Sequence, residues 1–408
     1  MGRIRIVNIV GARPNLMKMA PLMWAMNKSQ CIEPVLVHTG QHYDPSLSDI
    51  FFEQLDIRPP DYSLGVGSGS HSYQTAQIML KLEPLLKEIK PALVLVVGDV
   101  NSTVASALVA TKLHIFLAHV EAGLRSFDRT MPEEINRVVT DSVSHMLFVT
   151  EQSGVGNLCH EGVDLFLNEG RPIQDISEGI WTDFVASEQR GFSTRFGAFV
   201  GNVMIDTLLA IKEKAEEEAE IDLPGKDYAL LTMHRPSNVD DPETFRRIAS
   251  VLCQLSKEIP IFFPCHPRTQ KRIEEFGLVD SFVHVEGCST SSLSDSKIML
   301  LDPLGYFEFL KLMAHAKLVL TDSGGIQEET TILGVPCLTI RENTERPVTL
   351  TEGSNTLVGT DPERIIGSAR EVLHGNGKKG GCPVLWDGKA AERIVSILEL
   401  MGRLPIMS

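Results

Sequence analysis

Charged side chains crowd the segment Ala118–Arg137, AHVEAGLRSFDRTMPEEINR, directly after the apolar run Ile115–Val120, which is typical of a buried strand. The charged residues are Glu121, Arg125, Asp128, Arg129, Glu133, Glu134 and Arg137. Carboxylates transfer protons, guanidiniums bind anions, and open α/β sheets bind ligands beyond the carboxyl ends of their strands. The alternative is a solvated loop with surface ion pairs. Similar segments elsewhere in the chain favour an enzyme site.

Three further strand ends in the first half of the chain carry polar groups. The turn VGARPNLMK places Gly11 after a strand, with Arg13 and Lys18 in the helix that follows. Free backbone amides at such a turn suit a phosphate or carboxylate, although neither a Walker loop nor a GxGxxG fingerprint is present. VHTGQHYD places Gln41 and His42 after a second strand. VVGDVNST places Asp99 after a third, and because Asn101 or Ser102 could cap the next helix, Asp99 is expected to face the ligand.

The second half repeats this arrangement. Strand ends are followed by His234 and Arg235, by His266 and Arg268, and by the turn Ser323, Gly324, Gly325. The SGG turn opens a helix whose amides could hold a diphosphate, and it is the strongest anion-site signal in the chain. Glu329, about one turn further along, suits a pair of ribose hydroxyls. Arg341 and Arg346 could neutralise phosphate charge.

The elements that position these residues follow an alternating pattern of strands and helices. The predicted strands are Ile4–Val10, Pro34–His38, Ala92–Val97, Ile115–Val120, Met146–Thr150, Ala198–Val200, Tyr228–Thr232, Ile261–Pro264, Phe282–Val285, Leu318–Thr321 and Cys337–Ile340. Several are unbroken Val/Ile/Leu runs, as expected for parallel strands covered on both faces. Helical patterns such as Ile205–Glu220 and Pro242–Leu255 lie between them. The fold class is therefore α/β with two doubly wound, Rossmann-like domains facing a cleft.

The domain boundary is expected near Gly201, giving an N-terminal domain of residues 1–200 and a C-terminal domain of residues 201–387. The helix 388–402 could pack back on the first domain. Two stretches, Asn168–Arg195 and Gly287–Ser296, are interpreted as a surface excursion and a Ser-rich loop.

Composition bounds the classes of function. The chain has 408 residues, 43% hydrophobic content and a net charge of −15, which argues against binding to nucleic acid or an anionic membrane. No apolar run is long enough to cross a membrane, and the N-terminus enters a strand rather than a signal peptide. The seven cysteines are scattered, without a CxxC pair, and indicate reduced thiols in a cytoplasmic protein and no metal site.

Taken together, these segments resemble the UDP-N-acetylglucosamine 2-epimerase family, specifically its non-hydrolysing type. The matching motifs are GxRP at Gly11–Pro14, TGQH at Thr39–His42, GD at Gly98–Asp99, HVEAGLR at His119–Arg125, PEEINR at Pro132–Arg137, GNVMIDTLL at Gly201–Leu209, HR at His234–Arg235, DSGGIQEE at Asp322–Glu329 and TERP at Thr344–Pro347. The resemblance implies a fold of the glycosyltransferase-B type, no cofactor, and a homodimer that binds a UDP-sugar.

The resemblance also implies a reaction. UDP is eliminated across C1–C2 to leave 2-acetamidoglucal, and is then added back with the C2 proton on the other face. This requires an acid and a base on opposite faces and cations for the departing diphosphate. By motif position the catalytic residues are Asp99, Glu121, Glu133 and His234. Asp99 and Glu121 are expected to transfer protons at C2, Glu133 to assist, and His234 to stabilise the leaving group. A carboxylate pressed against other carboxylates would gain a raised pKa suited to a general acid.

The remaining implied site residues bind the nucleotide sugar. They are Arg13, Lys18, Gln41, Arg137, Arg235, His266, Phe309, Ser323, Gly324, Gly325, Glu329 and Arg346, with Phe309 against uracil and Glu329 on the ribose. The sequence departs from the family pattern at Asn15, where an acid is usual, and at Pro236, where HRPSN replaces HRREN. Allosteric activation by a second UDP-GlcNAc is therefore in question.

Three alternatives stay open. The hydrolysing relatives release UDP and free ManNAc, and they tend to carry proline directly after the matching histidine, where this chain has Arg235. A glycosyltransferase could share the scaffold, because a fold does not fix a function, but it would not explain the three carboxylates. A UDP-sugar sensor would bind without turnover. The expected function is reversible interconversion of UDP-GlcNAc and UDP-ManNAc for surface polysaccharide synthesis.

Overall fold

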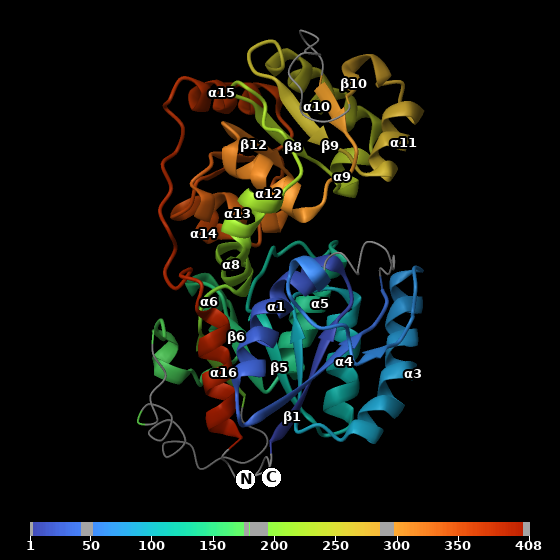
Figure 1. The fold of residues 1–408 in the computed structure, drawn as a ribbon, viewed down its shortest axis with the longest axis vertical. Coiled ribbons are helices and arrows are strands. Elements are labelled where there is room, and N and C mark those ends of the chain that lie inside the picture. Colours follow the sequence, from blue (N-terminus) through green and yellow to red (C-terminus); the bar gives the residue numbers. More distant parts are fainter. Residues whose placement is uncertain (1–2, 42–51, 175–178, 180–194, 286–297, 403–408) are drawn as a thin grey trace. The chain divides into compact units, whose positions relative to one another are not determined.

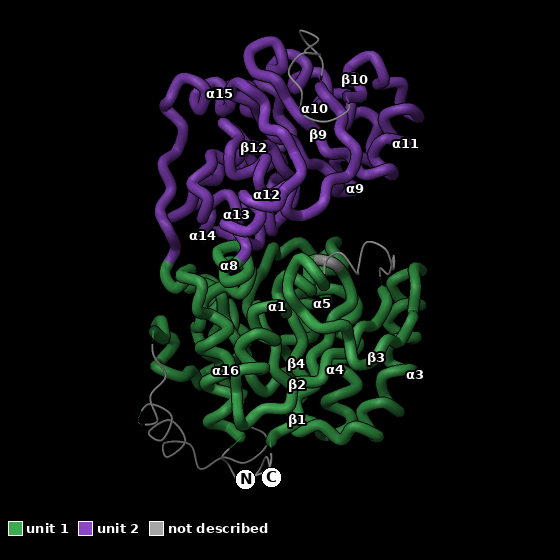
Figure 2. The backbone as a smooth tube through the Cα atoms, in the orientation of Figure 1, with its two compact units in different colours: residues 1–210, 384–408 green, residues 211–383 purple. Residues whose placement is uncertain are grey.

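The computed structural model describes residues 3–41, 52–174, 179, 195–285 and 298–402 (Figure 1). The chain forms two compact units: residues 1–210 with 384–408 make unit 1, and residues 211–383 make unit 2 (Figure 2). Helix α8, Val203–Glu218, runs across the boundary between them. Gly201, where the division was expected, lies just before this helix.

Unit 1 contains a parallel sheet with seven strands among the described residues, in the order β3-β2-β1-β4-β5-β6-β7. Its strands are β1 (Ile4–Val10), β2 (Ile32–His38), β3 (Tyr62–Ser63), β4 (Leu93–Val97), β5 (Phe116–Ala122), β6 (Met146–Val149) and β7 (Phe196–Phe199). Its helices are α1 (Arg13–Lys28), α3 (His71–Ile89), α4 (Asn101–Lys112), α5 (Pro132–Val143), α6 (Gln152–His160) and α16 (Ala390–Met401), with a 3₁₀ turn at Leu167–Gly170.

Helices cover both faces of this sheet. One face, including Val7 of β1 and Val94 of β4, packs in one apolar cluster with Leu82 of α3 and Val109 of α4. Helix α1 packs against β1, β2 and β4 and against α16, on the other face (Figure 1). In the order of the sheet, β2 follows β1 toward the β3 edge, whereas β5 follows β4 toward the β7 edge. Because the crossovers between parallel strands are right-handed, the helices change face at this point, which is the topological switch point of the sheet.

Unit 2 repeats the doubly wound plan. Its parallel sheet has the order β10-β11-β9-β8-β12-β13-β14 in the part of the chain described. The strands are β8 (Ala229–Thr232), β9 (Ile261–Pro264), β10 (Phe282–His284), β11 (Ile298–Leu301), β12 (Leu318–Thr321), β13 (Cys337–Thr339) and β14 (Asn355–Leu357). The helices are α9 (Pro236–Val239), α10 (Pro242–Leu255), α11 (Pro267–Glu275), α12 (Tyr306–His315), α13 (Gly324–Leu333), α14 (Pro347–Thr351) and α15 (Pro362–Leu373), with a 3₁₀ turn at Val279–Ser281.

The predicted fold class is confirmed as two doubly wound, Rossmann-like domains, and eleven of the observed strands coincide with predicted ones. Strands β3, β11 and β14 were not predicted. One predicted boundary is wrong in a place that matters: β5 extends through Glu121 to Ala122, so Glu121 lies within the strand and not after it. The loop Gly287–Ser296 and most of Asn168–Arg195 lie outside the described residues.

The two cysteines expected in the core, Cys265 and Cys337, are buried there. All six cysteines in the described ranges are free, these two among them. Burial raises the pKa of each of these two thiols to about 12, so they are inert core residues. No helix within the described ranges is long and apolar enough to cross a membrane.

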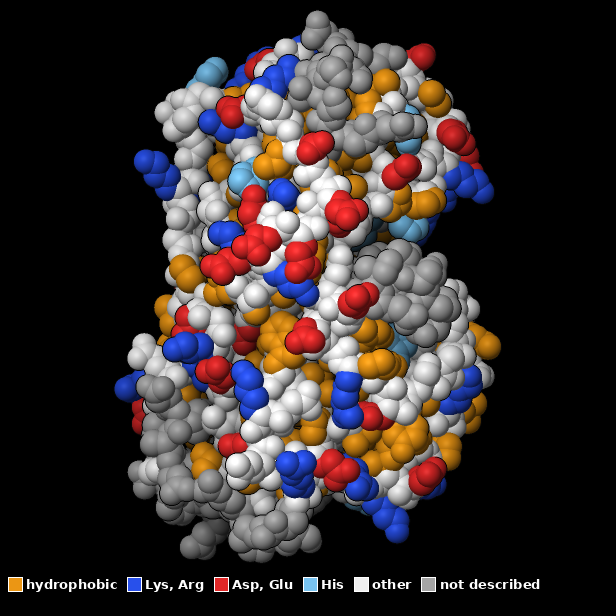
Figure 3. All heavy atoms as spheres, viewed as in Figure 1, with side chains coloured by type: hydrophobic (Ala, Val, Ile, Leu, Met, Phe, Trp, Pro, Cys, Tyr) orange, Lys and Arg blue, Asp and Glu red, His pale blue; other side chains and the backbone are white. Residues whose placement is uncertain are grey.

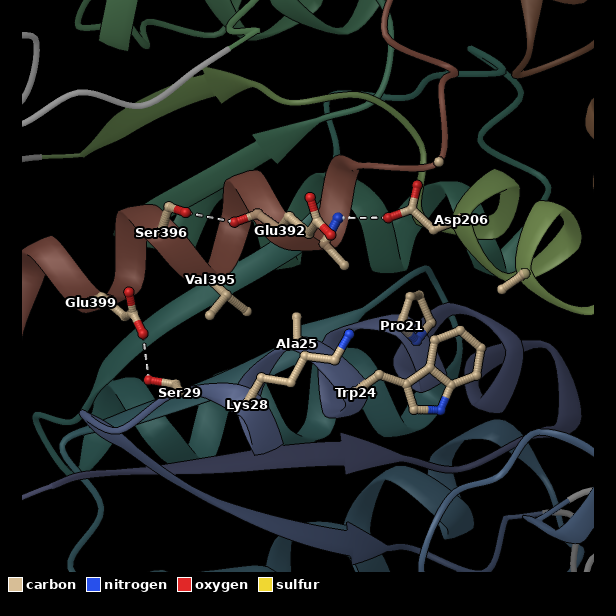
Figure 4. A pocket seen from close by; sticks show the side chains of 13 residues that line it. Pro21, Trp24, Ala25, Lys28, Ser29, Asp206, Glu392, Val395, Ser396 and Glu399 are labelled. Carbon is tan, nitrogen blue, oxygen red and sulfur yellow. Dashed lines mark hydrogen bonds between the residues drawn. The ribbon is translucent and has the colours of Figure 1, made fainter.

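The C-terminal segment returns to unit 1 and completes it. Trp386 is fully buried and its Nε1 donates to the carbonyl of Thr150, 3.2 Å away. Helix α16 begins where the carboxylate of Asp206 accepts hydrogen bonds from the amides of Ala390 and Ala391, at 3.1 and 2.7 Å (Figure 4). Between α16 and the second half of α1 lies a groove of about 300 Å³, lined by polar residues such as Lys28 and Glu392. None of the candidate site residues lines it.

Asp206 gives unit 1 a predicted pH dependence of stability. Burial raises its pKa from 3.8 to about 6, against the opposing effect of the Ala391 and Ala390 amides. A raised pKa in the folded state means that the folded protein binds this proton more tightly, so the stability it confers is complete below pH 4 and lost as the pH rises through 6. Between pH 4 and pH 7 the unfolding free energy of the wild type should fall by about 2 kcal/mol relative to Asp206→Asn. Urea unfolding followed by tryptophan fluorescence would check this, and parallel pH profiles would contradict it.

Candidate functional site

The candidate residues gather at the switch points of both sheets. In unit 1, helix α1 follows β1, and Gly98 and Asp99 follow the neighbouring strand β4. In unit 2, His234 and Arg235 follow β8, and Asp322 and Ser323 follow the neighbouring strand β12. Doubly wound sheets bind ligands at this place because the loops on its two sides diverge and leave room.

Glu121 in unit 1 forms a buried ion pair with Lys18. Lys18, on α1, donates to Oε2 of Glu121, and the two side chains are 9% and 2% exposed. Gly98 lies against both: a Cβ atom there would be 3.0 Å from Lys18 Nζ and 3.2 Å from Glu121 Oε2. Asn15 Nδ2 donates to the carbonyl of Val97 at 2.8 Å, which an acid at this position could not do when ionised. The ammonium group thus fixes the position of the Glu121 carboxylate.

Asp99 is held by Arg137 of helix α5. Its Oδ2 accepts from Nε of Arg137 at 3.0 Å and lies 2.8 Å from the NH2 nitrogen. Arg137 is also 2.5 Å from Glu134 Oε2, and the Asp99 carbonyl accepts from Asn136 at 2.9 Å. The side chain of Asp99 remains 24% exposed, so a ligand can reach it while the arginine orients it.

Asp99 and Glu121 each contact a cation, because Lys18 and Arg137 project from the helices that flank the strand ends. Both cations are thus placed to orient the carboxylates, and their expected contact with the nucleotide sugar stays a prediction. Glu133, half-buried in the first turn of α5, makes no hydrogen bond or ion pair within the described ranges.

Gln41 makes hydrogen bonds at the start of helix α4, and its expected contact with the nucleotide sugar stays a prediction. Its Oε1 accepts from the backbone nitrogen and the hydroxyl of Ser102, at 3.0 and 2.8 Å. It therefore caps helix α4, whose own N-cap residue, Val100, offers no side-chain hydrogen bond. The N-cap was expected to be Asn101 or Ser102, but it is Val100. Arg13 begins α1, but its side chain and His42 lie outside the described part of the structure.

In unit 2 the buried carboxylate of Asp322 organises the loop after β8. It accepts from the backbone nitrogens of His234 and Arg235 at 3.1 and 2.9 Å, and from Asn238 at 3.1 Å. His234 Nδ1 lies 3.1 Å from Oδ1, while its side chain is 58% exposed. Burial alone would raise the pKa of Asp322, but the hydrogen bond and charge of His234 and the two amides hold it below its usual value. Asp322 thus orients an exposed imidazole.

The SGG turn forms the N-terminus of helix α13. Ser323 is the N-cap residue, and its side chain makes no capping hydrogen bond. The Ser323 amide donates to the Thr321 hydroxyl at 3.0 Å, so an anion at this turn would meet the amides of Gly324 and Gly325 and the positive end of the helix dipole. The carboxylate of Glu345 packs against Gly324 of this turn. It lies 2.8 Å from Arg341 and 3.6 Å from Arg235. A Cβ atom at Gly324 would be 2.7 Å from its Oε1, so glycine is required.

Glu329 lies on α13, buried to 3% exposure, and Oε1 accepts from the hydroxyl of Tyr306 at 2.7 Å. Burial raises its pKa to about 7, with the Tyr306 hydrogen bond opposing and the charge of Glu328 adding to the shift. Near neutral pH both forms of this carboxyl are populated, so it can accept or donate a hydrogen bond.

Three more residues of unit 2 were expected to bind the nucleotide sugar. His266 is the exposed N-cap of α11, and its Nδ1 accepts from the Arg268 amide at 3.2 Å. Phe309 is half-buried on α12. Arg346, just before α14, is buried, and its Nε lies 2.7 Å from Glu328 Oε1.

The buried cations contrast with the acidic surface. Acidic side chains gather over helix α8 in Figure 3, where Glu213, Glu216, Glu217 and Glu218 are exposed. Lys18, Arg137, Arg341 and Arg346 are all below 10% exposure. Each of these cations forms an ion pair with a carboxylate, so the strand ends carry closely spaced charges of both signs. No group of three metal-ligating side chains occurs within the described ranges.

Sequence reasoning missed the residues that orient the site. Asp322 had a usable signal, since it follows a strand directly within DSGG. Tyr306 had none, because it lies 23 residues before its partner Glu329. Asp141 and Glu134, which hold the loop after β5, look like surface charges of an amphipathic helix.

Comparison with known proteins identifies relatives over nearly the whole chain. The sequence model of the UDP-N-acetylglucosamine 2-epimerase family matches residues 25–177 and 188–399. The UDP-N-acetylglucosamine 2-epimerase of Methanocaldococcus jannaschii is 40% identical over 398 residues, 96% of this chain and 97% of the relative. The UDP-2,3-diacetamido-2,3-dideoxy-D-glucuronate 2-epimerase of Pseudomonas aeruginosa is 37% identical over 397 residues, 97% and 99% respectively.

Solved structures agree. The crystal structure of the M. jannaschii UDP-GlcNAc 2-epimerase in complex with UDP-GlcNAc and UDP has a TM-score of 0.79 at 40% identity, and the match covers 97% of this chain and 99% of that chain. The fold of this chain is accordingly of the glycosyltransferase-B type.

Proposed function

This chain belongs to the UDP-N-acetylglucosamine 2-epimerase family, and from that premise we propose that it interconverts UDP-GlcNAc and UDP-ManNAc without net hydrolysis. The observation that carries the proposal is the pair of carboxylates at the unit 1 switch point, Asp99 and Glu121, each oriented by its own cation. A binding protein would have no need for two oriented proton-transfer groups.

The reaction proceeds by elimination and re-addition. The C2 proton is not acidic, so its removal is coupled to breaking the C1–O bond to UDP, which leaves 2-acetamidoglucal. UDP then adds back to C1 while a proton is delivered to the opposite face of C2. Asp99 and Glu121 serve as the acid and base of these steps, and Glu133 assists. Lys18 and Arg137 keep the two carboxylates in place, which lowers the reorganisation needed during proton transfer.

Unit 2 supplies the groups for the nucleotide. The uncapped turn at Ser323, Gly324 and Gly325 holds the diphosphate. His234, oriented by Asp322, stabilises the charge that develops on the departing UDP. Glu329 binds the ribose hydroxyls, Phe309 contacts uracil, and Arg235, His266 and Arg346 complete the groups of unit 2. Arg13, at the start of α1 in unit 1, also contacts the nucleotide sugar in this proposal.

The non-hydrolysing outcome is favoured by the residue after His234. The amide of Arg235 donates to Asp322 at 2.9 Å, and proline, which the hydrolysing relatives tend to carry here, has no such amide. In the non-hydrolysing reaction UDP stays bound until it is added back. We further propose that the product supplies surface polysaccharide synthesis and that the enzyme is a cytoplasmic homodimer.

A second UDP-sugar should be tested as a substrate. The P. aeruginosa relative, named for a UDP-sugar with an acetamido group at C3 and a carboxylate at C6, is nearly as similar as the M. jannaschii enzyme. The elimination is the same for both sugars, because the reacting atoms are C1 and C2.

The deciding experiment is a proton NMR time course in deuterium oxide with UDP-GlcNAc alone. The expected result is UDP-ManNAc carrying deuterium at C2. Free ManNAc as the main product would replace the proposal by the hydrolysing activity. An unchanged, fully protonated substrate, with turnover of the diacetamido glucuronate in a parallel sample, would move the proposal to that sugar. The absence of turnover with both would refute epimerase activity.

Glu329 gives a separate prediction for unit 2. Glu329→Ala removes the hydrogen bonds to the ribose and should weaken UDP binding by about 10- to 100-fold, since hydrogen bonds to charged groups contribute about 1.5–3 kcal/mol. Isothermal titration with UDP measures the change. Glu363→Ala, at an exposed position on α15, is the control and should bind as the wild type does. Unchanged affinity in Glu329→Ala would remove the residue from the ribose site.

A further inference from the structure

Strand β5 carries a bulge at the residue proposed for proton transfer. Val120 pairs with Phe148 of β6 and Ala122 pairs with Val149, so Glu121 between them has no partner in the register. Its φ is +73°, in the left-handed region that side chains other than glycine disfavour. A conformation of this kind persists only where surrounding contacts enforce it.

The carboxylate of Asp141, on helix α5, spans the bulge. Oδ1 accepts from His119 Nδ1 at 2.6 Å, and Oδ2 accepts from the Gly123 amide at 3.0 Å, so the two residues lie on opposite sides of Glu121. Arg125 lies 2.7 Å from Oδ2. Burial alone would raise the pKa of Asp141, but His119, Arg125 and the Gly123 amide hold it below its usual value. An ionised carboxylate thus clamps the strand around Glu121.

His119 extends this connection to the other strand end. Its Nε2 donates to the carbonyl of Gly98 at 2.8 Å. Both ring nitrogens of this fully buried imidazole therefore face oxygen atoms. Gly98, with φ +66°, directly precedes Asp99 and packs against the Lys18–Glu121 pair. One imidazole ring thus links the backbone beside Asp99 to the strand that carries Glu121.

We propose that His119 and Asp141 are positioning residues of the epimerisation: the His119–Gly98 hydrogen bond fixes the separation of the two proton-transfer carboxylates. This inference rests on the proposed function. It predicts a loss in the proton-transfer steps without a loss in nucleotide binding, because the UDP groups belong to unit 2. Displacements of about 1 Å in such a site can lower rates about 10²-fold.

Two amide substitutions at His119 separate the two halves of the link. In His119→Gln the amide nitrogen takes the place of Nε2 and still reaches Gly98, whereas in His119→Asn it takes the place of Nδ1 and reaches only Asp141. We expect kcat and the rate of C2 deuterium exchange to fall about 10²-fold in His119→Asn and less than about 10-fold in His119→Gln. The KM and the Kd for UDP should stay within about twofold in both.

Asp206→Ala is the control for stability, since it also removes a buried carboxylate of unit 1 that accepts two backbone amides. It should lower Tm and leave kcat unchanged. Equal kcat values in the two His119 variants, whether both match the wild type or both are reduced, would overturn the inference. If His119→Asn does not fold, Asp141→Asn replaces it. A wild-type rate of C2 exchange in Asp141→Asn would also overturn the inference. Wild-type protein without exchange would instead refute the proposed function.

Discussion

Glu121→Gln is expected to lower the rate of C2 deuterium exchange by about 10⁴-fold, the upper end of what a positioned acid or base contributes. The amide cannot take the proton, while its shape keeps the place beside Gly98. The Kd for UDP should change by less than about twofold, because most of the groups proposed to bind the nucleotide belong to unit 2. Exchange is followed by proton NMR and binding by titration calorimetry.

Asp99→Asn tests proton transfer in a variant whose folding is not expected to suffer. Loss of Glu121 leaves Lys18 buried without its partner, which can cost about 3–5 kcal/mol of stability. Asp99 is partly exposed and Arg137 keeps Glu134, so Asp99→Asn should fold and still lose exchange. Glu33→Gln, which removes an exposed ion pair with Arg5, is the matched control and should exchange normally. Wild-type exchange in either site variant would exclude that residue from proton transfer.

His234→Ala is expected to lower kcat by about 10²- to 10³-fold, the usual effect of removing one group that stabilises charge developing in the transition state. The imidazole is 58% exposed and held by Asp322, so it is oriented and open to the diphosphate in the proposed role. The Kd for UDP-GlcNAc should change much less, because the negative charge on the leaving UDP grows only as the C1–O bond breaks. Steady-state kinetics and equilibrium binding separate these quantities.

His234→Gln provides the control, because its amide nitrogen retains a donor near the position of Nε2. It should recover part of the lost kcat. Full activity in His234→Ala would exclude the leaving-group role. A rise in Kd as large as the fall in kcat/KM would assign the residue to ground-state binding.

The fold was accessible from the sequence because both sheets are buried on both faces. Strands such as β1, β9 and β12 are mostly apolar runs, and their predicted bounds match the structure. Strand β3 is only two residues long and exposed, so it lacks a hydrophobic signal. Strand β11 is only four residues long, and β14 begins with a buried asparagine, so neither stands out.

The candidate site was accessible only in part. Strand ends located Asp99, His234 and the SGG turn, because a polar residue after an apolar run is visible in the sequence. What those residues touch was not visible. The contacts of Lys18 with Glu121, of Arg137 with Asp99 and of Gln41 with Ser102 join residues far apart in the chain, and their geometry depends on the packed sheet. Hydrogen-bond partners are set by tertiary structure, which neither composition nor spacing encodes.

The return of residues 384–401 to unit 1 has a consequence for the order of synthesis. Trp386 and helix α16 fill unit 1 only after the ribosome has translated all of unit 2. At about 5–20 residues per second, unit 2 adds about ten seconds or more during which helix α1 lacks its neighbour α16. Unit 2, contiguous in sequence, can complete its core first. A nascent chain therefore exposes the apolar surface that α16 will cover, and this interval is when a chaperone would be needed most.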